Sequence, residues 1–247
     1  MKNVMEVKNV SKKIKGRTII EDMSFEIKEG EVCGFVGPNG AGKTTIIRLL
    51  TGLIKPNAGK LLINEIDVTK HRKQALVKLG AIVESPIFFN YMTGREILIN
   101  LVRLHPNIAK EERLNRVEEV LDIVNLGKRG NDKVSTYSLG MNQRLGIAQA
   151  LLGKPEIIIL DEPANGLDPL GMKELRELIL KLNKEQGISF LVSSHLLDEL
   201  RKICTKFVII NEGKLKFKGT SEEFFSISEG SIEDIFLQVL GGKGESA

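Results

Sequence analysis

The sequence of 247 residues is poor in cysteine and has no long apolar run. Its two cysteines, Cys33 and Cys204, lie in apolar surroundings, which argues against a disulfide scaffold and favours a reducing compartment. The longest apolar runs, such as 157–160, fall far short of the roughly 20 residues that a membrane-spanning helix needs. The N-terminal segment carries scattered lysines and no continuous apolar stretch, so we expect no signal peptide and no span across a membrane.

The excess of basic over acidic residues is also small. Lys+Arg 36 against Asp+Glu 32 gives a net charge of +4, too weak a balance to indicate a nucleic-acid partner. Apolar residues make up 42% of the chain and charged residues 28%, which is ordinary for a globular protein and unlike a disordered one. We therefore expect one or two globular domains of about 150 residues each and no nucleic acid.

Two apolar patterns predict two kinds of strand. Near the N-terminus, apolar residues alternate with charged ones, as in the half-buried strands of an antiparallel layer; they are Met5, Val7, Val10, Met23, Phe25 and Ile27. Residues 157–160 and 190–192 are instead continuous apolar runs, typical of parallel strands that are covered on both faces. A helical pattern over about 170–185, ended by Gly187, separates the two runs. Strand, helix and strand in this order indicate an α/β core.

The middle of the chain is mostly helical in pattern. Thr93 and Glu96 form a predicted capping box, and 111–124 repeats apolar residues as an amphipathic helix does; these are Leu114, Val117, Val120, Leu121 and Val124. We expect residues 1–84 and 153–219 to form the α/β core, with 85–152 inserted as a helical subdomain. A short helical extension over 220–247, with helices starting at Thr220 and Ser231, would follow this 1–219 domain.

The most specific local signal is a phosphate-binding P-loop. Its pattern is matched in full by Gly37, Pro38, Asn39, Gly40, Ala41, Gly42, Lys43 and Thr44. Glycines allow successive backbone N–H groups to point at a phosphate, where a Cβ would obstruct them. Lys43 would neutralise the β- and γ-phosphates, and the Thr44 hydroxyl would hold Mg²⁺. A strand-like segment before the loop and a helix-like segment after it support the prediction.

A nucleotide hydrolase also needs a carboxylate at the end of a neighbouring strand. Asp161 and Glu162 follow the apolar run 157–160 directly. Asp161 would reach Mg²⁺, and Glu162 would act as the base that orients the attacking water. Alone, two acidic residues after a buried strand would be unremarkable, but beside a P-loop they predict nucleotide hydrolysis.

Three further segments resemble motifs of one family. Residues 138–144 open a helix, the segment 165–169 follows Glu162 closely, and His195 follows a later buried strand. In this order they resemble the signature, D-loop and switch histidine of the ATP-binding cassette (ABC) ATPases. The resemblance covers nearly the whole chain and implies a P-loop NTPase fold, with a RecA-like parallel-sheet core, an N-terminal antiparallel β layer and an inserted helical subdomain.

The resemblance also implies roles for single residues. Two subunits would pack head to tail, so that the signature of one chain, Ser138, Leu139, Gly140 and Met141, meets the γ-phosphate held by the P-loop of the other. Asp168 would belong to the D-loop, and His195 would sense the γ-phosphate. ATP and Mg²⁺ are the implied cofactors. Thr45 and Ile14 would also contact ATP, and Glu84 would join Thr44 and Asp161 at the metal.

The chain departs from the family pattern at three places. Ile14 stands where an aromatic ring usually stacks on adenine, Leu139 and Met141 replace usual residues of the signature, and Glu84 replaces the usual glutamine. Together with the C-terminal segment 231–236, Ser-Ile-Glu-Asp-Ile-Phe, these departures resemble the ATPase subunits of bacitracin-type and lantibiotic-immunity exporters.

The expected function is thus the ATP-hydrolysing subunit of an exporter of an antimicrobial peptide, drug or lipid-linked compound. Its partners would be a second copy of the chain in a homodimer, or a paired ATPase subunit, with ATP at the interface, and a separate ABC-2-type membrane permease, bound near 85–95. The subunit would be cytoplasmic and peripheral on the inner face of the cell membrane. Two alternatives remain at this point: the ATPase of an importer, although many importer ATPases keep the glutamine that Glu84 replaces, and a soluble ABC ATPase that acts on DNA or ribosomes.

Overall fold

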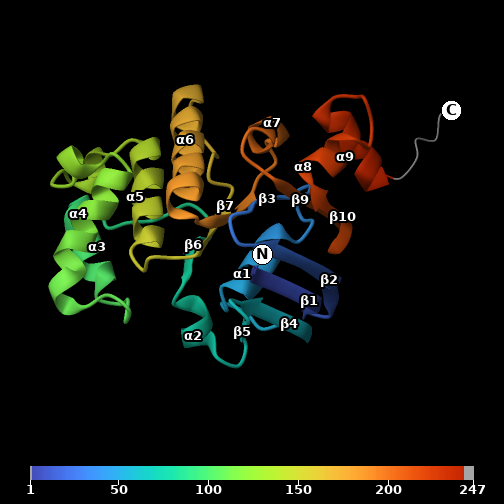
Figure 1. Ribbon diagram of the computed structural model, residues 1–247, viewed down its shortest axis with the longest axis horizontal. Helices are drawn as coiled ribbons and strands as arrows, with labels where there is room; N and C mark the ends of the chain where they lie inside the picture. The colour runs from blue at the N-terminus through green and yellow to red at the C-terminus, as the bar shows by residue number, and fades with distance from the viewer. Residues whose placement is uncertain (1, 242–247) are drawn as a thin grey trace.

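The computed structural model describes residues 2–241, in which two β-sheets are surrounded by helices (Figure 1). Within these residues the larger sheet has the strand order β10-β9-β3-β8-β7-β6. Its strands are β3 (Val32–Val36), β6 (Leu79–Ile82), β7 (Ile157–Asp161), β8 (Ser189–Ser193), β9 (Lys206–Asn211) and β10 (Lys214–Thr220). All neighbours pair in parallel except β10, which is antiparallel to β9. The predicted α/β fold is confirmed.

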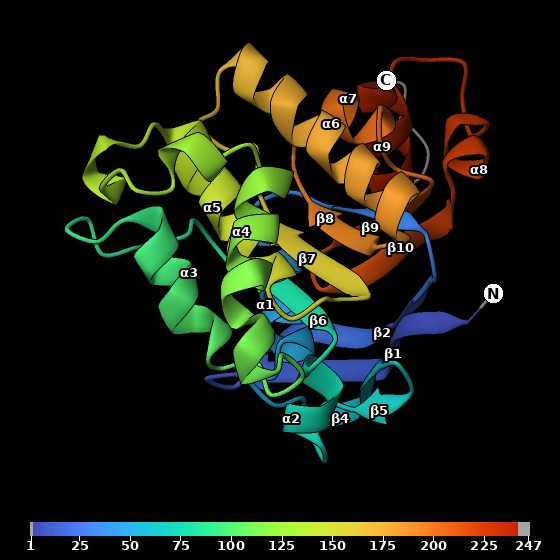
Figure 2. The same cartoon turned by 60° about the vertical axis from the view of Figure 1, so that its left-hand side comes forward.

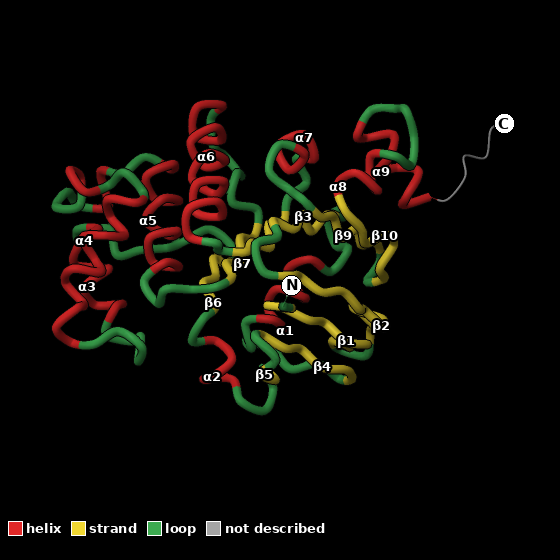
Figure 3. Tube along the Cα trace, in the orientation of Figure 1, coloured by secondary structure: helices red, strands yellow, loops and turns green. Residues whose placement is uncertain are grey.

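The smaller sheet is antiparallel, with the order β2-β1-β4-β5. Its strands are β1 (Asn3–Ile14), β2 (Arg17–Lys28), β4 (Ala58–Ile63) and β5 (Ile66–Asp67). All six apolar residues of the predicted alternation are buried. Helix α1 (Lys43–Leu50) contacts β2 and β4 of this sheet and β7 of the larger one, so it lies between the two sheets (Figure 3).

The remaining helices lie mainly around the larger sheet. They are α2 (Arg72–Leu76), α3 (Gly94–Val102), α4 (Arg113–Ile123), α5 (Leu139–Leu151), α6 (Pro169–Gln186), α7 (Leu197–Arg201), α8 (Ser221–Phe225) and α9 (Ile232–Gly241). Helices α3, α4 and α5 contact one another and stand together at one end of the molecule (Figure 2). All three lie between β6 and β7 in the chain, within the segment 85–152 that the sequence predicts to be helical.

The strands that carry the site are buried throughout. Every residue of β3, β7 and β8 is buried, as expected for continuous apolar runs that helices or a second sheet cover on both faces. Helix α6 follows β7, begins after its N-cap Asp168 and ends at Gly187, whose φ of 67° gives the left-handed cap that the sequence predicts. The capping boxes at Thr93 and Thr220 are both present.

The predicted helix over 111–124 is correct except in its first turn. A 3-10 turn (Lys110–Glu112) precedes α4, and Leu114, expected on the apolar face, is 62% exposed. The buried position in that turn belongs to Arg116, whose guanidinium donates to the carbonyl oxygens of Leu151 and Leu152 at the end of α5. At the C-terminus, α9 begins after Ser231 as predicted, and residues 242–247 of the predicted extension lie outside the described residues.

Candidate active site

The P-loop connects the buried strand β3 to helix α1 by a tight turn. The Ala41 amide donates to the Pro38 carbonyl oxygen at 3.1 Å. A Cβ on Gly37 would lie 2.4 Å from the Ile210 carbonyl oxygen of β9, and Gly42 has a φ of +107°, which side chains rarely adopt. Glycine is therefore required at both positions for the loop to close between the two sheets.

The loop borders a cavity of about 370 Å³, here called the P-loop cavity. It is lined by Ile19, Pro38, Asn39, Gly40, Gly42, Lys43, Thr44, Thr45 and Glu162. Gly42 caps α1 without a side chain, so the first N–H groups of the helix stay available to an anion. Lys43 is buried, and its Nζ donates to the Gly37 carbonyl oxygen at 2.7 Å. The cavity therefore combines a helix N-terminus with a buried cation, a combination suited to phosphate.

Asp161 ends strand β7 and points to the start of α1. Its Oδ2 accepts from the Thr44 hydroxyl at 3.2 Å, and its Oδ1 accepts from the Ser193 hydroxyl. Ser193 lies opposite Asp161 in the pairing of β7 with β8, and both side chains are buried. The carboxylate is thus held by one hydroxyl of strand β8 and one of the P-loop helix α1.

Glu162 leaves the sheet by a left-handed turn with a φ of 47°. Its amide donates to the carbonyl oxygen and to the hydroxyl of Ser193, at 3.1 and 3.0 Å. These bonds hold a backbone conformation that is costly for a residue with a Cβ. As a result the Glu162 carboxylate lines the P-loop cavity, whereas its neighbour Asp161 stays in the sheet.

Three predicted catalytic side chains form one chain of contacts across this edge. Lys43 Nζ lies 3.7 Å from Glu162 Oε1, and Glu162 Oε2 lies 2.9 Å from His195 Nδ1. The Glu162 side chain is 20% exposed and that of His195 is 53% exposed. The structure therefore brings a cation, a carboxylate and an imidazole together at one edge of the sheet, although Lys43 and His195 lie 152 positions apart in sequence.

The donors near Thr44 fit a magnesium ion that also binds phosphate. Among residues 2–241, no group of three or more His, Cys, Asp or Glu side chains could hold a metal by itself. Mg²⁺ in nucleotide sites is held by one or two carboxylates together with substrate phosphates. The hydroxyl of Thr44 and the carboxylate of Asp161 supply oxygen donors of this kind beside the cavity.

A second cavity, of about 390 Å³, lies between α5 and α6 and is here called the signature cavity. It is lined by Ser138, Leu139, Gly140, Arg144, Gly166, Leu167, Asp168, Leu170, Gly171 and Glu174. Ser138 caps α5, its hydroxyl accepting from the Met141 amide at 3.2 Å, and Asp168 caps α6, accepting from the Gly171 amide at 2.8 Å. The two cavities share no lining residue, so the signature and the P-loop of one chain face different spaces.

Comparison with known proteins identifies the family. A family model described as ABC transporter matches residues 20–165 of the chain. The chain belongs to this family. Among its relatives, the uncharacterised ABC transporter ATP-binding protein YhcH of Bacillus subtilis (strain 168) is 50% identical over 87% of this chain and 69% of that protein. The bacitracin transport ATP-binding protein BcrA of Bacillus licheniformis is 43% identical over the same shares. The predicted resemblance to bacitracin-type ABC ATPases is confirmed.

Solved structures agree with this assignment. The structure of an ATP-binding subunit of an ABC transporter has a TM-score of 0.84 and 29% identity, and covers 96% of this chain and 99% of that chain. A dimeric post-hydrolysis structure of the ATP-binding cassette MJ0796 with ADP and Pi has a TM-score of 0.77 and 26% identity, and covers 88% and 98%. The chain is the ATP-binding subunit of an ABC transporter and an ATP hydrolase.

Two predicted site residues of this ABC ATPase lie apart from the P-loop cavity. Glu84 has a left-handed φ of 68°, and its carboxylate forms an ion pair with Arg48 at the end of α1. Ile14, the last residue of β1, is 41% exposed. Neither side chain lines the P-loop cavity. The roles of Glu84 at the metal and of Ile14 at the base therefore stay predictions.

Two residues at the site of this ABC ATPase are not predicted from its sequence. Ser193 joins Asp161 to the backbone of Glu162, and Ile19 of β2 lines the P-loop cavity. A serine at the end of a buried apolar run is only a weak indication of a functional residue, because its role depends on which strand lies beside it in the sheet. Ile19 gave no signal, because an apolar residue within an alternating strand is indistinguishable from a core residue in sequence.

Proposed function

We propose that this ABC ATPase drives an exporter by binding Mg-ATP between the P-loop cavity of one subunit and the signature cavity of a second. The observation that carries the proposal is the contact chain from Lys43 through Glu162 to His195. Lys43 and Glu162 line a P-loop cavity that no signature residue of the same chain lines. A site of this kind has the groups for hydrolysis and lacks a cover for the γ-phosphate.

The roles of the side chains follow from their chemistry. Lys43 and the N-terminus of α1 neutralise the phosphates, and Thr44 and Asp161 would hold Mg²⁺. Bound there, the metal would neutralise charge that develops on the phosphate oxygens. Glu162 orients the water that attacks the γ-phosphate and accepts its proton. His195, hydrogen-bonded to the same carboxylate, would fix the direction of Glu162 and sense the γ-phosphate.

The missing cover would come from a second copy packed head to tail. Ser138 and the first N–H groups of α5 form a helix N-terminus, which favours an anion. The signature cavity holds the small residues Gly140, Gly166 and Gly171, which allow close approach of another chain. Each ATP would then be shared, so hydrolysis would require a closed dimer.

A permease would bind beside α3. A groove of about 280 Å³ is lined by Ile87, Phe88, Phe89, Met92, Ile97, Asn100, Leu101 and Gln149. Ile87 is 94% exposed, and the ring of exposed Phe89 lies 5.6 Å from that of Tyr91. Exposed apolar side chains at a groove suit an amphipathic segment of a partner. No helix within residues 2–241 is long and apolar enough to span a bilayer.

The proposed partner is therefore a separate membrane permease of the ABC-2 type, bound through the residues 85–95 of the proposed helical subdomain, 85–152. The ATPase would then lie on the inner face of the cell membrane. The relatives favour export as the direction: BcrA is a bacitracin transport ATP-binding protein, and LnrL of Bacillus subtilis (strain 168), 32% identical, is a linearmycin resistance ATP-binding protein.

Replacement of Glu162 tests the proposal. Glu162→Gln keeps the size of the side chain but removes the base, so turnover should fall by about 10²–10⁴ while ATP binding persists. ATP should then trap a dimer, measured by size-exclusion chromatography with light scattering. Glu156→Gln is the matched control, because this exposed carboxylate precedes β7 and, among residues 2–241, forms an ion pair only with Lys78, at 3.9 Å. Normal turnover by the Glu162 variant would remove this residue from the role.

A further inference from the structure

The position of His195 depends on a short helix. Its side chain is half-exposed, and it lies in the loop between β8 and α7. Helix α7 has five residues and no side-chain cap at its N-terminus. Isolated helices of this length are unstable in water, so tertiary contacts must fix α7. The contacts of α7 therefore set the place of the histidine.

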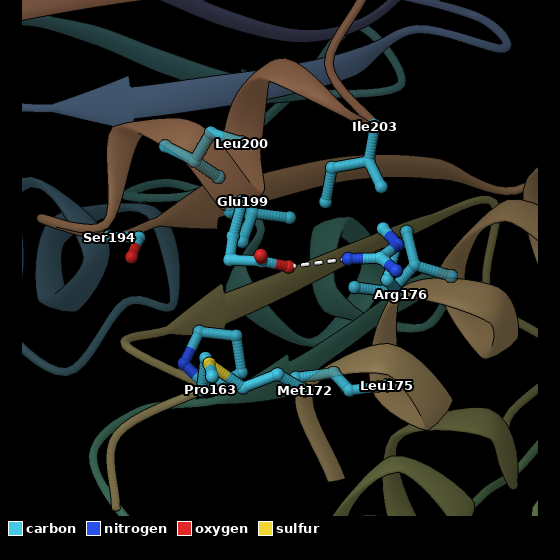
Figure 4. A pocket seen from close by; sticks show the side chains of 11 residues that line it. Pro163, Met172, Leu175, Arg176, Ser194, Glu199, Leu200 and Ile203 are labelled. Atoms are coloured by element: carbon cyan, nitrogen blue, oxygen red, sulfur yellow. Dashed lines mark hydrogen bonds and ion pairs between the residues drawn. The ribbon is translucent and has the colours of Figure 1, made fainter. Parts of the chain in front are cut away.

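One of these contacts is an ion pair with α6 (Figure 4). Arg176 Nη1 donates to Glu199 Oε2 at 2.7 Å, and both side chains are about three-quarters buried, at 24% and 25% exposure. Hydrogen bonds from Lys202 and Arg176 lower the pKa of Glu199, so its carboxylate is charged at neutral pH. A partly buried, charge-assisted hydrogen bond of this kind is stronger than a pair in open solvent.

The surroundings of the pair leave α7 little freedom. The pair borders a small cavity of about 30 Å³, which is also lined by Pro163 beside Glu162, Ser194 beside His195 and apolar side chains of α6 and α7 (Figure 4). A space of that size admits about one water molecule. Because interiors packed in this way transmit displacements, a shift of α6 would move α7 with it.

Helix α6 begins at the other half of the ATP site. Its N-cap Asp168 lines the signature cavity, and Arg176 follows eight residues later, about 12 Å along the helix. A rigid helix therefore joins a residue that would face the second subunit to the ion pair that holds α7.

We propose that Arg176 and Glu199 are positioning residues for hydrolysis. Their ion pair couples the position of helix α6, which begins at the D-loop residue Asp168, to the position of α7 and His195. Docking of the second subunit against the start of α6 would thereby align the histidine with Glu162. The inference rests on the proposed roles of His195 and Glu162. Neither Arg176 nor Glu199 lines the P-loop cavity, so ATP affinity should not depend on them.

The first test separates turnover from binding. In the full-length chain, Arg176→Gln should lower kcat about tenfold and leave the KM for ATP within about twofold. Glu199→Gln should do the same, and Arg176→Lys, which keeps the charge, should recover most of the rate. Lys173→Gln and Lys202→Gln are the controls: Lys173 pairs with Glu177 on the outer side of α6, and Lys202 contacts Glu199 without involving α6. Equal losses in the Lys202 and Arg176 variants would overturn the link through α6.

The second test asks whether the ion pair acts through the histidine. In a His195→Ala background, Arg176→Gln should lower the remaining kcat by less than twofold, because the group that it positions is gone. A tenfold loss in both backgrounds would overturn the inference and leave the proposed function intact. If His195→Ala alone hydrolysed ATP normally, the proposed role of the histidine would fail first. Thermal unfolding of each variant shows whether lost rate reflects lost folding.

Discussion

On the P-loop half of the site, the side chains predicted to act on ATP contact one another; on the signature half, the predicted residues Ser138 and Asp168 each cap their own helix. Lys43, Glu162 and His195 form one chain of contacts, and Thr44 and Asp161 form another pair beside it. In the signature cavity, by contrast, the Ser138 hydroxyl and the Asp168 carboxylate each accept from an amide of the helix that follows.

From this difference we infer that the P-loop half performs the chemistry and that the signature half recognises the nucleotide. The charged groups that would act on the γ-phosphate are held in place by contacts within one chain. The signature half offers a helix N-terminus and small residues, which in the proposed dimer would only have to meet an anion at the right distance. Such a half can do no chemistry alone, and so each subunit would depend on the other.

The largest expected effect comes from damaging the two halves in different chains. Lys43→Ala removes the buried cation and Ser138→Arg fills the signature cavity, so each variant alone should lose about 10²–10³ in ATPase rate. In a head-to-tail dimer of one chain of each kind, one site carries both changes and the other is intact. Mixtures should therefore recover up to about a quarter of wild-type activity, if dimers form at random and the sites act independently.

The control for this mixture is a titration at constant total protein, with mixed dimers verified by cross-linking of differently tagged chains. Activity should peak near equal amounts of the two variants. An inactive mixture in which mixed dimers are present would contradict independent, shared sites.

The same substitution in each half should have opposite effects on stability. Gly37→Ala places a Cβ 2.4 Å from a backbone oxygen of β9, and overpacking of this kind costs about 1–3 kcal/mol in unfolding free energy. Gly140→Ala meets no atom closer than 3.9 Å, and alanine favours a helix over glycine by up to about 1 kcal/mol. Thermal unfolding should show a lower midpoint for the first variant and an equal or higher one for the second.

Hydrolysis should nevertheless fall in both glycine variants. In the Gly140 variant the added methyl group would stand where the partner's phosphate approaches, so we expect at least a tenfold loss with undiminished folding. Full activity of a stable Gly140→Ala protein would show that the signature does not approach the nucleotide this closely.

The smallest expected effect concerns Glu84, which belongs to neither cavity. Glu84→Gln should keep ATP hydrolysis of the subunit within about tenfold, less than about 1.4 kcal/mol in the barrier. Transport by the complex with its permease should fall further, because Glu84 lies between α1 and the groove at Ile87. ATPase and transport are to be measured in one membrane preparation.

Arg48→Gln is the matched variant for that experiment, since it breaks the same exposed ion pair from the other side. Equal phenotypes of the Arg48 and Glu84 variants would assign the effect to the pair. Loss of hydrolysis in the Glu84 variant alone would instead favour a direct contact with the metal.

Much of this molecule could be predicted because its signals are local. The P-loop, the continuous strands and the capping boxes at Thr93 and Thr220 are set by neighbours in sequence, and the structure has them as expected. The end of α6 at Gly187 followed from one glycine in the left-handed region.

The features that escaped prediction depend on partners far away in the chain. Arg48 and Glu84 attract each other because α1 and the end of β6 meet in space, which no spacing in the sequence reveals. Arg116 takes a buried position that the apolar period assigned to Leu114, because the carbonyl oxygens at the end of α5 need a donor. The role of Ser193 likewise depends on the order of the strands, because the pairing of β7 with β8 places Ser193 opposite Asp161.

That strand order also has a consequence for the order of assembly during synthesis. Strand β8 lies between β3, which leads into the P-loop, and β7, which ends at Asp161. Neighbouring strands are spaced by about 4.8 Å, so β3 and β7 stand about 10 Å apart with β8 filling the gap. A nascent chain that has emerged only through α6 already contains Lys43, Thr44, Asp161 and Glu162, yet it lacks the strand that sets their separation. We therefore expect the nucleotide site to be completed late, by insertion of a middle strand, and a partly made subunit to lack the geometry that holds ATP for hydrolysis.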